Sequence, residues 1–263
     1  MLAGQLNPLV AALRMSPYWM PPNGALHGFA LDRLMKFNLI TITLLFLLAH
    51  ILLLIAFLKR RRASTLARLS RVEFLPLVAI CGLYVWMAVT AQRLWAANRF
   101  EGPSLEAMQI EVVGVQFQWY FRYPGEDATF GATRPQLVNP GAANPLGIDP
   151  QDSQGNDDIV SSELVLPAGR EVDLRLRAHD VIHGFFIPGM RLKQNAVPGL
   201  ILHVHFTPTM PGEYPIYCSQ VCGLGHGHME AKLRVVPPAE FRQWLSQHEQ
   251  KRLVEQSAVG TGS

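Results

Sequence analysis

The sequence predicts a two-helix membrane hairpin followed by an all-β domain, and three observations lead to this expectation. Only 16% of the 263 residues are charged and 49% are hydrophobic, whereas in soluble globular proteins about 25% of residues are charged. The apolar residues concentrate in two uncharged runs in the N-terminal part of the chain. After residue 98 the composition changes to β-branched and aromatic residues separated by Pro and Gly, which is typical of strands and turns.

Two uncharged runs predict the membrane-spanning helices. The first covers residues 37–58, and its 22 residues are mostly Leu, Ile and Phe; about 20 suffice to cross the hydrocarbon core. The second covers residues 74–92 and carries Tyr84 and Trp86, aromatic residues of the kind that anchor a helix at the membrane interface. A buried helix of a soluble protein is the alternative for each run, and the length of the runs favours the membrane.

Charge is distributed unevenly along the chain. Residues 1–98 carry ten Lys and Arg against two acidic residues, a net charge of +8, and the remainder carries thirteen against eighteen, a net charge of −5. Six of the basic residues lie within residues 59–71, between the two runs, and the positive-inside rule places this segment in the cytoplasm. Both chain ends then face outward. The N-terminal stretch lacks the features of a cleavable signal peptide, and nucleic-acid binding explains an apolar basic half poorly.

The second part of the chain predicts strands of a β-sandwich or barrel. The predicted strands lie in residues 108–123, 171–177, 200–206, 213–218 and 229–236. Turn formers without apolar periodicity in residues 124–158 predict a long surface loop. A terminal helix over residues 238–254, which opens with Pro, and a flexible tail follow. The expected domains are residues 1–98, 99–240 and 241–263.

A cluster of metal-binding residue types follows the strand at 213–218. Cys218, Cys222, His226 and Met229 have the spacing C-x3-C-x3-H-x2-M. Thiolate, imidazole and thioether together favour copper, since soft sulfur binds Cu(I) and imidazole accepts either oxidation state. The intervening glycines permit a compact loop in which these ligands converge. A copper site needs a further nitrogen donor, and His183 is the best candidate from elsewhere in the chain.

Structural alternatives exist for each part of this cluster. Two neighbouring cysteines outside the cytoplasm often form a disulfide, and a single methionine usually fills a core. Because Cys218, Cys222, His226 and Met229 lie so close together in sequence, we instead interpret the cysteines and the methionine as metal ligands. We expect the other histidines after residue 98 to be solvent-exposed or supporting residues, and Cys81 to be a small apolar residue of the second run. The sequence has no CxxCH motif, which excludes a fused haem c domain.

Three motifs, DVIHGFFIPG, QFQWYFRYPG and CSQVCGLGHGHM, make the chain resemble subunit II of the haem-copper cytochrome c oxidases over nearly its whole length. That resemblance implies a cupredoxin-like, Greek-key β-sandwich with a dinuclear copper centre, CuA. By the same resemblance, the thiolates of Cys218 and Cys222 bridge two copper ions. His183 and His226 supply one imidazole to each ion, and Met229 and the backbone carbonyl of Gln220 are the weak axial ligands.

The resemblance also implies a function and its partners. The chain would be the electron-accepting subunit of a terminal oxidase in a bacterial plasma membrane, with its copper domain on the periplasmic side. It would take electrons from cytochrome c and pass them to a haem in subunit I, for oxygen reduction coupled to proton translocation. Phe117 and Trp119 align with the aromatic residues at which electrons enter. The −5 balance predicts an acidic docking face for the donor, with contributions from Asp180, Asp157 and Asp158.

Some positions depart from the family's pattern, and other functions stay open. Gln220 and Asn195 stand where members commonly have the acidic residues Glu and Asp, so a protein-built magnesium site is not expected. Glu73 lies closer to Pro76 than the Glu at the family's proton channel does. One alternative function is the CuA subunit of a nitric oxide reductase. Another, of a different class, is a membrane-anchored copper-delivery protein.

Overall fold

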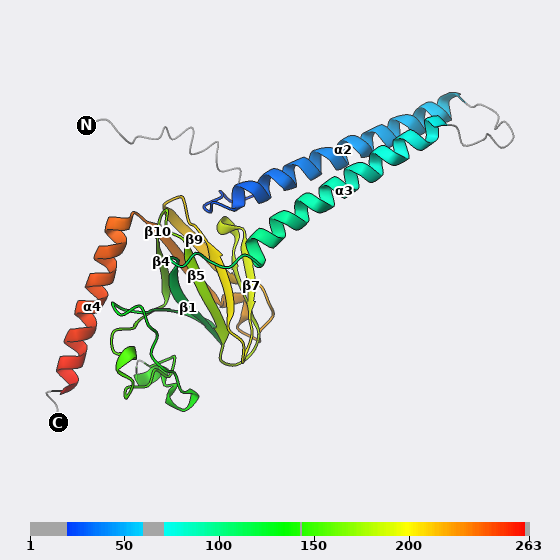
Figure 1. Cartoon of the computed structure of the whole chain (residues 1–263). Coiled ribbons are helices and arrows are strands. Elements are labelled where there is room, and N and C mark those ends of the chain that lie inside the picture. Colours follow the sequence, from blue (N-terminus) through cyan, green and yellow to red (C-terminus); the bar gives the residue numbers. More distant parts are fainter. Residues whose placement is uncertain (1–19, 60–70, 143, 261–263) are drawn as a thin grey trace. The chain divides into compact units, whose positions relative to one another are not determined.

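The computed structural model describes residues 20–59, 71–142 and 144–260. The chain divides into two compact units, residues 29–101 and a second unit that joins residues 102–263 to the N-terminal residues up to 28. Figure 1 shows the long helices of the first unit and the strands of the second. Most of the basic segment 59–71, which carries the prediction of a cytoplasmic loop, lies outside the described residues.

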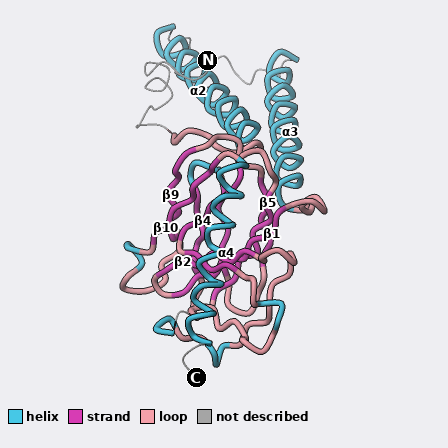
Figure 2. Tube along the Cα trace, turned by 90° about the vertical axis from the view of Figure 1, so that its left-hand side faces the viewer, coloured by secondary structure: helices cyan, strands magenta, loops and turns pink. Residues whose placement is uncertain are grey.

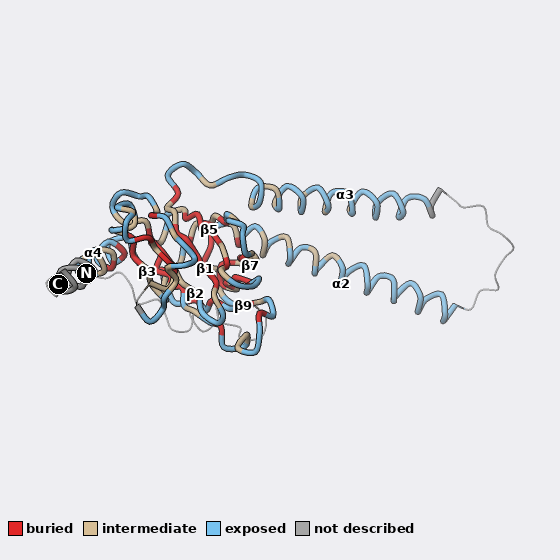
Figure 3. The backbone as a smooth tube through the Cα atoms, turned by 90° about the horizontal axis from the view of Figure 1, so that it is seen from below, coloured by how far each residue is buried: buried red, intermediate tan, exposed pale blue. Residues whose placement is uncertain are grey.

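Two long helices, α2 (Gly28–Lys59) and α3 (Arg71–Arg99), form most of the first unit and include the two predicted runs. Helix α2 has 32 residues, about 48 Å at 1.5 Å per residue, which exceeds the roughly 30 Å of a hydrocarbon core. By length and composition both helices qualify as membrane spans. Their Leu, Ile and Phe residues are exposed along almost the entire length, and most of both helices has the colour of exposed residues in Figure 3. Burial in this chain therefore does not explain their hydrophobicity.

The second unit is a sandwich of two five-stranded sheets, which confirms the predicted β-sandwich (Figure 2). One sheet has the order β3 (Ile159–Ser161), β2 (Gln118–Tyr123), β1 (Met108–Val115), β5 (Val172–Ala178) and β8 (Leu202–Phe206). The other has the order β4 (Glu163–Pro167), β10 (Glu230–Val236), β9 (Gly212–Cys218), β6 (His183–Ile187) and β7 (Leu192–Ala196). The pairs β1–β5 and β4–β10 are parallel, and the other pairs are antiparallel.

Alternation along strand β9 places the first metal-binding candidate in the interior. Tyr214, Ile216 and Cys218 are buried, whereas Pro215 and Tyr217 between them are exposed. This is the period of two expected for a strand with one face on a core. The last inward-facing position of the strand is thus a cysteine.

The structure adds strands that the sequence pattern did not reveal. The predicted strand 108–123 is two antiparallel strands, β1 and β2, and the short strands β3, β4 and β7 were not expected. Strand β7 lies at the edge of its sheet and reads LKQNA. Polar residues are compatible with an edge because much of such a strand faces solvent, and the hydrophobic alternation is then lost.

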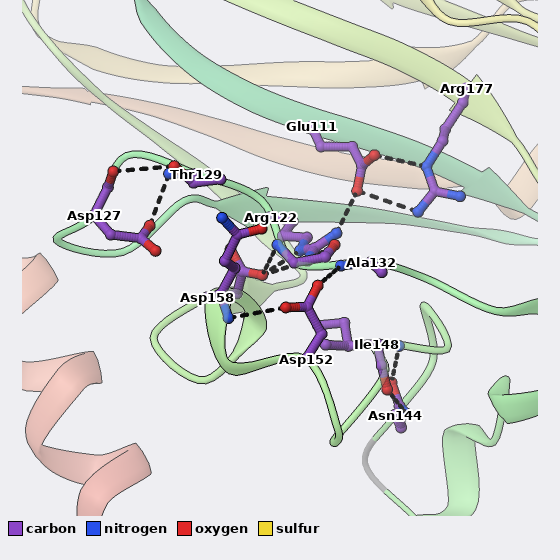
Figure 4. A network of polar contacts seen from close by, with 12 residues as sticks. Glu111, Arg122, Asp127, Thr129, Ala132, Asn144, Ile148, Asp152, Asp158 and Arg177 are labelled. Atoms are coloured by element: carbon purple, nitrogen blue, oxygen red, sulfur yellow. Dashed lines mark hydrogen bonds and ion pairs between the residues drawn. The ribbon is translucent and has the colours of Figure 1, made fainter.

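Residues 124–158 form a long loop with three short 3-10 helices, η1 (Pro135–Leu137), η2 (Pro140–Ala142) and η3 (Ser153–Gly155). The loop is fastened to the sheet by the buried guanidinium of Arg122, as Figure 4 shows. Arg122 forms an ion pair with Asp158 and donates to the Gly131 carbonyl at 2.6 Å. It also contacts Glu111 of strand β1 at 3.3 Å. The predicted surface loop is therefore attached to the sheet through buried polar contacts. Asp158, one of the polar residues that suggested solvent exposure, makes one of these contacts.

Helix α4 (Pro238–Gly260) confirms the predicted terminal helix and extends further than expected. Phe241 and Trp244 are buried on the sandwich, where the Trp244 ring lies 4.9 Å from the ring of Tyr123. The end predicted at residue 254 is wrong by six residues, because the sequence EQSAV at 255–259 contains neither Pro nor Gly. The first part of the predicted tail is helical, and residues 261–263 lie outside the described residues.

A short N-terminal segment, residues 20–27, packs on the sandwich. The backbone N–H of Gly24 donates to the Gly189 carbonyl at 2.8 Å, and its carbonyl accepts from the N–H of Thr209 at 2.7 Å. A β-carbon at Gly24 would lie 2.6 Å from the Tyr214 hydroxyl oxygen, so the contact requires glycine. Ala25 beside it is fully buried. The segment before helix α2 thus completes the sandwich unit.

Candidate metal centre

Strands β6 and β9 bring together residues that lie 35 positions apart in the chain. His183 is the first residue of β6, Cys218 is the last residue of β9, and Phe185 of β6 pairs with Cys218 across the ladder. The loop after β9 carries Cys222. A short 3-10 turn, η5 (His226–His228), then begins with His226, and Met229 lies directly before strand β10. The rigid pairing of two strands therefore positions the one candidate ligand that is remote in sequence.

All six predicted ligands converge on one small region. The Sγ atoms of Cys218 and Cys222 are 3.8 Å apart, and these sulfurs lie within 4.8 Å of a ring nitrogen of His183. Cys222 Sγ is 3.7 Å from His226 Nδ1 and 3.8 Å from Met229 Sδ. Cys218 Sγ is 3.1 Å from the backbone carbonyl oxygen of Gln220. The two cysteines are not joined by a disulfide, so both sulfurs are available as ligands.

His183 gives the strongest indication that this cluster binds a metal. Its side chain is 0% exposed, and Nε2 lies 2.8 Å from Oδ1 of Asp180. The other ring nitrogen, Nδ1, is buried and has no hydrogen-bond partner in the described part of the chain. Buried polar atoms normally have a partner, and an unpaired one costs about 1–3 kcal/mol. A metal ion beside the thiols would satisfy Nδ1, and a carboxylate on the opposite nitrogen is the usual support of a metal-binding imidazole.

The two thiols also fit a cation better than an empty pocket. Burial, together with the hydrogen bond and the charge of the neighbouring Cys218, raises the pKa of the Cys222 thiol to about 11. Two thiolates at this separation would repel each other in a site shielded from water. A bound metal ion compensates that repulsion and displaces the thiol protons. The donor set, two sulfurs with imidazoles and a thioether, matches the preference of copper.

Asp180 holds His183 in place through a small network. Burial alone would raise the pKa of this carboxyl, but the hydrogen bonds to it from His183 and from the backbone N–H groups of Gln116 and Val181, together with the charge of His183, lower the pKa below its usual value. Both backbone N–H groups donate to the carboxylate at 2.7 Å. The sequence suggested Asp180 as part of a docking face, whereas its hydrogen bonds are directed to the imidazole and the local backbone. It is a positioning residue that residue types alone did not reveal.

Close packing fixes the backbone around these ligands. A β-carbon at Gly184 would lie 2.4 Å from Ser219 Oγ and 2.8 Å from the backbone nitrogen of Gln220. The N–H of Ser219 donates to the Gly184 carbonyl at 2.8 Å. Backbone of strand β6 can approach the ligand loop this closely only because residue 184 has no side chain.

Two aromatic residues at the start of strand β2 occupy different environments. Trp119 is 0% exposed, and its ring makes edge contacts with the rings of His183 and Phe185. Phe117 is 38% exposed and packs against the metal-binding loop, since a β-carbon at Gly225 would lie 2.4 Å from its ring. Phe117 thus lies between this loop and the solvent, whereas Trp119 packs against the His183 ring in the interior. Their roles in electron transfer stay predictions.

The rim of the site is apolar, and the predicted acidic residues are occupied elsewhere. Val221 and Leu224 of the ligand loop are among the most exposed hydrophobic residues of the domain. Asp158 is buried and paired with Arg122, so its proposed contribution to a docking face is wrong. Asp157 accepts hydrogen bonds from two backbone N–H groups of its own loop. The sequence showed these acids as charges but not their partners.

In the described part of the chain, His183 and the two cysteines form a close group of possible metal ligands, and His226 lies beside it, next to Cys222. The remaining histidines after residue 98 do not join this group. His203 Nδ1 lies 2.7 Å from Oδ2 of Asp173, and His179 Nε2 lies 3.0 Å from Arg177 Nη1. His248 Nδ1 contacts the carbonyl of Trp244 in helix α4. Asn195 pairs with Gly184 across β6 and β7. The side chain of Glu73, the candidate for a proton-channel residue, lies outside the described residues.

Comparison with known proteins agrees with this site. A sequence model of the family described as cytochrome c oxidase subunit II, periplasmic domain, matches residues 108–236. The alternative cytochrome c oxidase subunit 2 of Bradyrhizobium diazoefficiens is 34% identical over 162 residues, covering 61% of this chain and 58% of that protein. Cytochrome c oxidase subunit 2 of Thermostichus vulcanus is 34% identical over 140 residues, covering 53% of this chain and 33% of that protein.

Among solved structures, the periplasmic domain of subunit II of cytochrome oxidase (CoxB) of Bradyrhizobium japonicum matches with 25% identity. The match covers 57% of this chain and 97% of that one, with a TM-score of 0.42. The chain spans between a third and three fifths of the length of the two relatives. The range that the family model matches contains strands β1 to β10 and the loop after β9. Residues 108–236 are thus similar to the family of cytochrome c oxidase subunit II periplasmic domains, which bears out the resemblance found in the sequence.

Proposed function

We propose that this protein is the electron-accepting subunit of a membrane-bound haem-copper terminal oxidase. It accepts electrons from cytochrome c at a dinuclear copper centre and passes them to a haem in subunit I, which reduces oxygen and translocates protons. The observation that carries the proposal is the unpaired Nδ1 of His183, fully buried beside two free thiols. The similarity of the chain to cytochrome c oxidase subunits 2 of other bacteria supports it.

Each ligand has a part in this proposal. Cys218 and Cys222, whose sulfurs are 3.8 Å apart, would hold two copper ions together, and His183 and His226, which both lie near these sulfurs, would each supply an imidazole. Met229 Sδ and the Gln220 carbonyl oxygen are the weak donors. Two copper ions held in this way supply reversible one-electron transfer with the unpaired electron shared between them.

The scaffold suits electron transfer because it restricts movement of the ligands. His183 is held by Asp180 on one side and by the Trp119 ring on the other. The β6–β9 ladder fixes Cys218, and contact with Gly184 fixes the loop after it. Rigid ligands that keep their geometry in both oxidation states lower the reorganisation on each electron transfer.

The copper-delivery alternative fits the burial of the site less well. A delivery protein must release its metal to a partner, whereas His183, Cys222 and Met229 are all buried. A nitric oxide reductase subunit would need the same centre, and the identity of the partner subunit separates that alternative from an oxidase. The exposed apolar helices α2 and α3 support anchoring in the plasma membrane. The basic segment 59–71 between them supports a copper domain on the periplasmic side.

Electron paramagnetic resonance of the copper-loaded full-length protein tests the proposal. We expect a mixed-valence signal in which one electron is spread over two copper nuclei, with a copper-to-protein ratio of two. Hyperfine splitting from a single nucleus would contradict the dinuclear assignment. Copper that a soluble chelator removes within seconds would favour a delivery protein, and co-purification with a subunit that reduces nitric oxide in place of oxygen would favour the reductase.

A further inference from the structure

A groove between helices α2 and α3 has not been given a role so far. It has a volume of about 520 Å³ and lies entirely within the unit of residues 29–101. Most of its lining is apolar, but two arginines share it. The lining residues are Ala30, Arg33, Leu34, Phe37, Trp86, Thr90, Arg93 and Leu94.

The arginines lie where the uncharged part of each helix ends. Arg33 precedes the uncharged run that starts at Phe37, and Arg93 follows directly after the run that ends at Gln92. Both line the same groove, so these two ends of the runs lie at the same end of the hairpin. In a bilayer the two arginines would therefore lie at the depth of the lipid headgroups, and the uncharged runs would lie in the hydrocarbon core.

Aromatic contacts give the groove a defined wall. The rings of Phe37 and Trp86 meet edge to face with their centroids 4.9 Å apart, one ring from each helix. The hydroxyl of Thr90 donates to the Trp86 carbonyl at 2.8 Å, so its hydrogen is used within helix α3. On the side of the uncharged runs, away from the two arginines, the groove therefore offers apolar surface to a ligand.

We propose that this groove binds an anionic phospholipid, with one acyl chain along Leu34, Phe37 and Trp86 and the phosphate between Arg33 and Arg93. The proposal rests on the membrane location of the hairpin proposed above. Neither guanidinium has an ion pair within the described part of the chain, and Asp32 is not a lining residue. A guanidinium binds a phosphate through paired hydrogen bonds, and a phospholipid combines that anion with an apolar chain.

A helix of a partner subunit is the competing occupant. Such a helix would cover two arginines and would have to bring its own carboxylates to pair with them, because an unpaired charge removed from water is costly. A lipid brings the anion and the chain in one molecule and is already present in the surrounding bilayer. Charge complementarity at the mouth of an apolar groove therefore favours the lipid.

Native mass spectrometry of the full-length protein in detergent tests the proposal. The protein is titrated with phosphatidylglycerol or with phosphatidylcholine of identical acyl chains. We expect tighter binding of phosphatidylglycerol, and a loss of about fivefold in its affinity for each of Arg33→Gln and Arg93→Gln, as one basic residue at an anionic surface contributes. Lys36→Gln, on the same helix but outside the groove, is the matched control and should change nothing.

Several outcomes would overturn the site. Equal affinity for the two lipids would refute recognition of an anionic headgroup. If Lys36→Gln lowered the affinity as much as the arginine substitutions, the interaction would be a general attraction between charges and not a specific site. Leu34→Trp, which fills the groove and keeps both arginines, should abolish the preference; an unchanged preference would exclude the groove. A photo-crosslinker at Leu34 that labels a protein subunit of the assembled oxidase, and no lipid, would establish the helix as occupant. Release of the chain from membranes by alkaline carbonate would instead refute the membrane location.

Discussion

A single methyl group at position 184 should disturb the copper centre without removing any ligand. In the folded protein a β-carbon there would lie 2.4 Å from Ser219 Oγ and 2.8 Å from the backbone nitrogen of Gln220. Ordinary contacts begin near 3.4 Å. The side chain of Ser219 must therefore retreat by about 1 Å and the backbone of Gln220 by about 0.6 Å. That movement displaces the carbonyl oxygen now 3.1 Å from Cys218 Sγ.

Overpacking of this kind costs about 1–3 kcal/mol in the free energy of unfolding. We expect Gly184→Ala to lower the stability of the metal-free protein by this amount. The copper-loaded form should retain two ions but show an altered hyperfine pattern, because the carbonyl ligand and the strand next to His183 both move. Chemical unfolding of the metal-free protein and electron paramagnetic resonance of the loaded protein measure the two effects.

Gly227→Ala is the matched control within the same ligand loop. A β-carbon at Gly227 meets no atom within 4 Å, and the residue lies between His226 and His228. The control should therefore keep both the stability and the spectrum of the unmodified protein. If Gly184→Ala behaved in the same way, the close approach of strand β6 to the loop would not be what holds the copper centre in shape.

Further substitutions separate the remaining roles. Cys218→Ser and Cys222→Ser should each abolish the mixed-valence signal, since one remaining sulfur cannot delocalise the electron over two ions; a retained signal would exclude two bridges. Met229→Leu should keep the copper and raise the reduction potential in voltammetry, because a weak donor to the oxidised state is lost. Asp180→Asn should lower copper affinity about 10–100-fold with unchanged circular dichroism, through weaker support of His183. Phe117→Ala should slow reduction by cytochrome c in stopped flow at equal copper content. Trp119→Ala should mainly lower the free energy of unfolding, by about 3–5 kcal/mol. The reverse result would show that Trp119, and not Phe117, makes the contact with the electron donor.

The parts of the structure that the sequence predicted depend on local patterns. Uncharged runs mark the helices because about 20 apolar residues are required to cross a bilayer. The alternation in residues 213–218 marks strand β9, and it points Cys218 inward before any fold is known. The spacing of Cys222, His226 and Met229 limits them to one loop, so their convergence with Cys218 needs only a turn. These inferences require neither register nor pairing of strands.

The parts that could not be predicted depend on which strands pair. Residues 20–27 join the sandwich unit although a long helical hairpin separates them from it in sequence. Strand β7 has no alternation to detect, and the sequence offered Asp180 only as a negative charge. An aspartate three residues before a histidine becomes its hydrogen-bond partner only when the turn before β6 brings the two together. A search for carboxylates near each candidate ligand histidine would have found it.

The acidic residues show why a net charge does not locate a docking surface. Several carboxylates of the sandwich unit are buried and paired: Glu111 and Asp158 with Arg122, Asp149 with Arg134, and Asp173 with His203. Each counts toward the net charge of −5, yet the arginines beside Glu111, Asp158 and Asp149 cancel most of the field of these three carboxylates at the surface. What surrounds the copper ligands is apolar surface, from Val221 and Leu224 to the exposed edge of Phe117. Contact with a donor at this rim would be made by apolar side chains, and charges farther away would affect the rate of encounter more than the geometry of electron transfer.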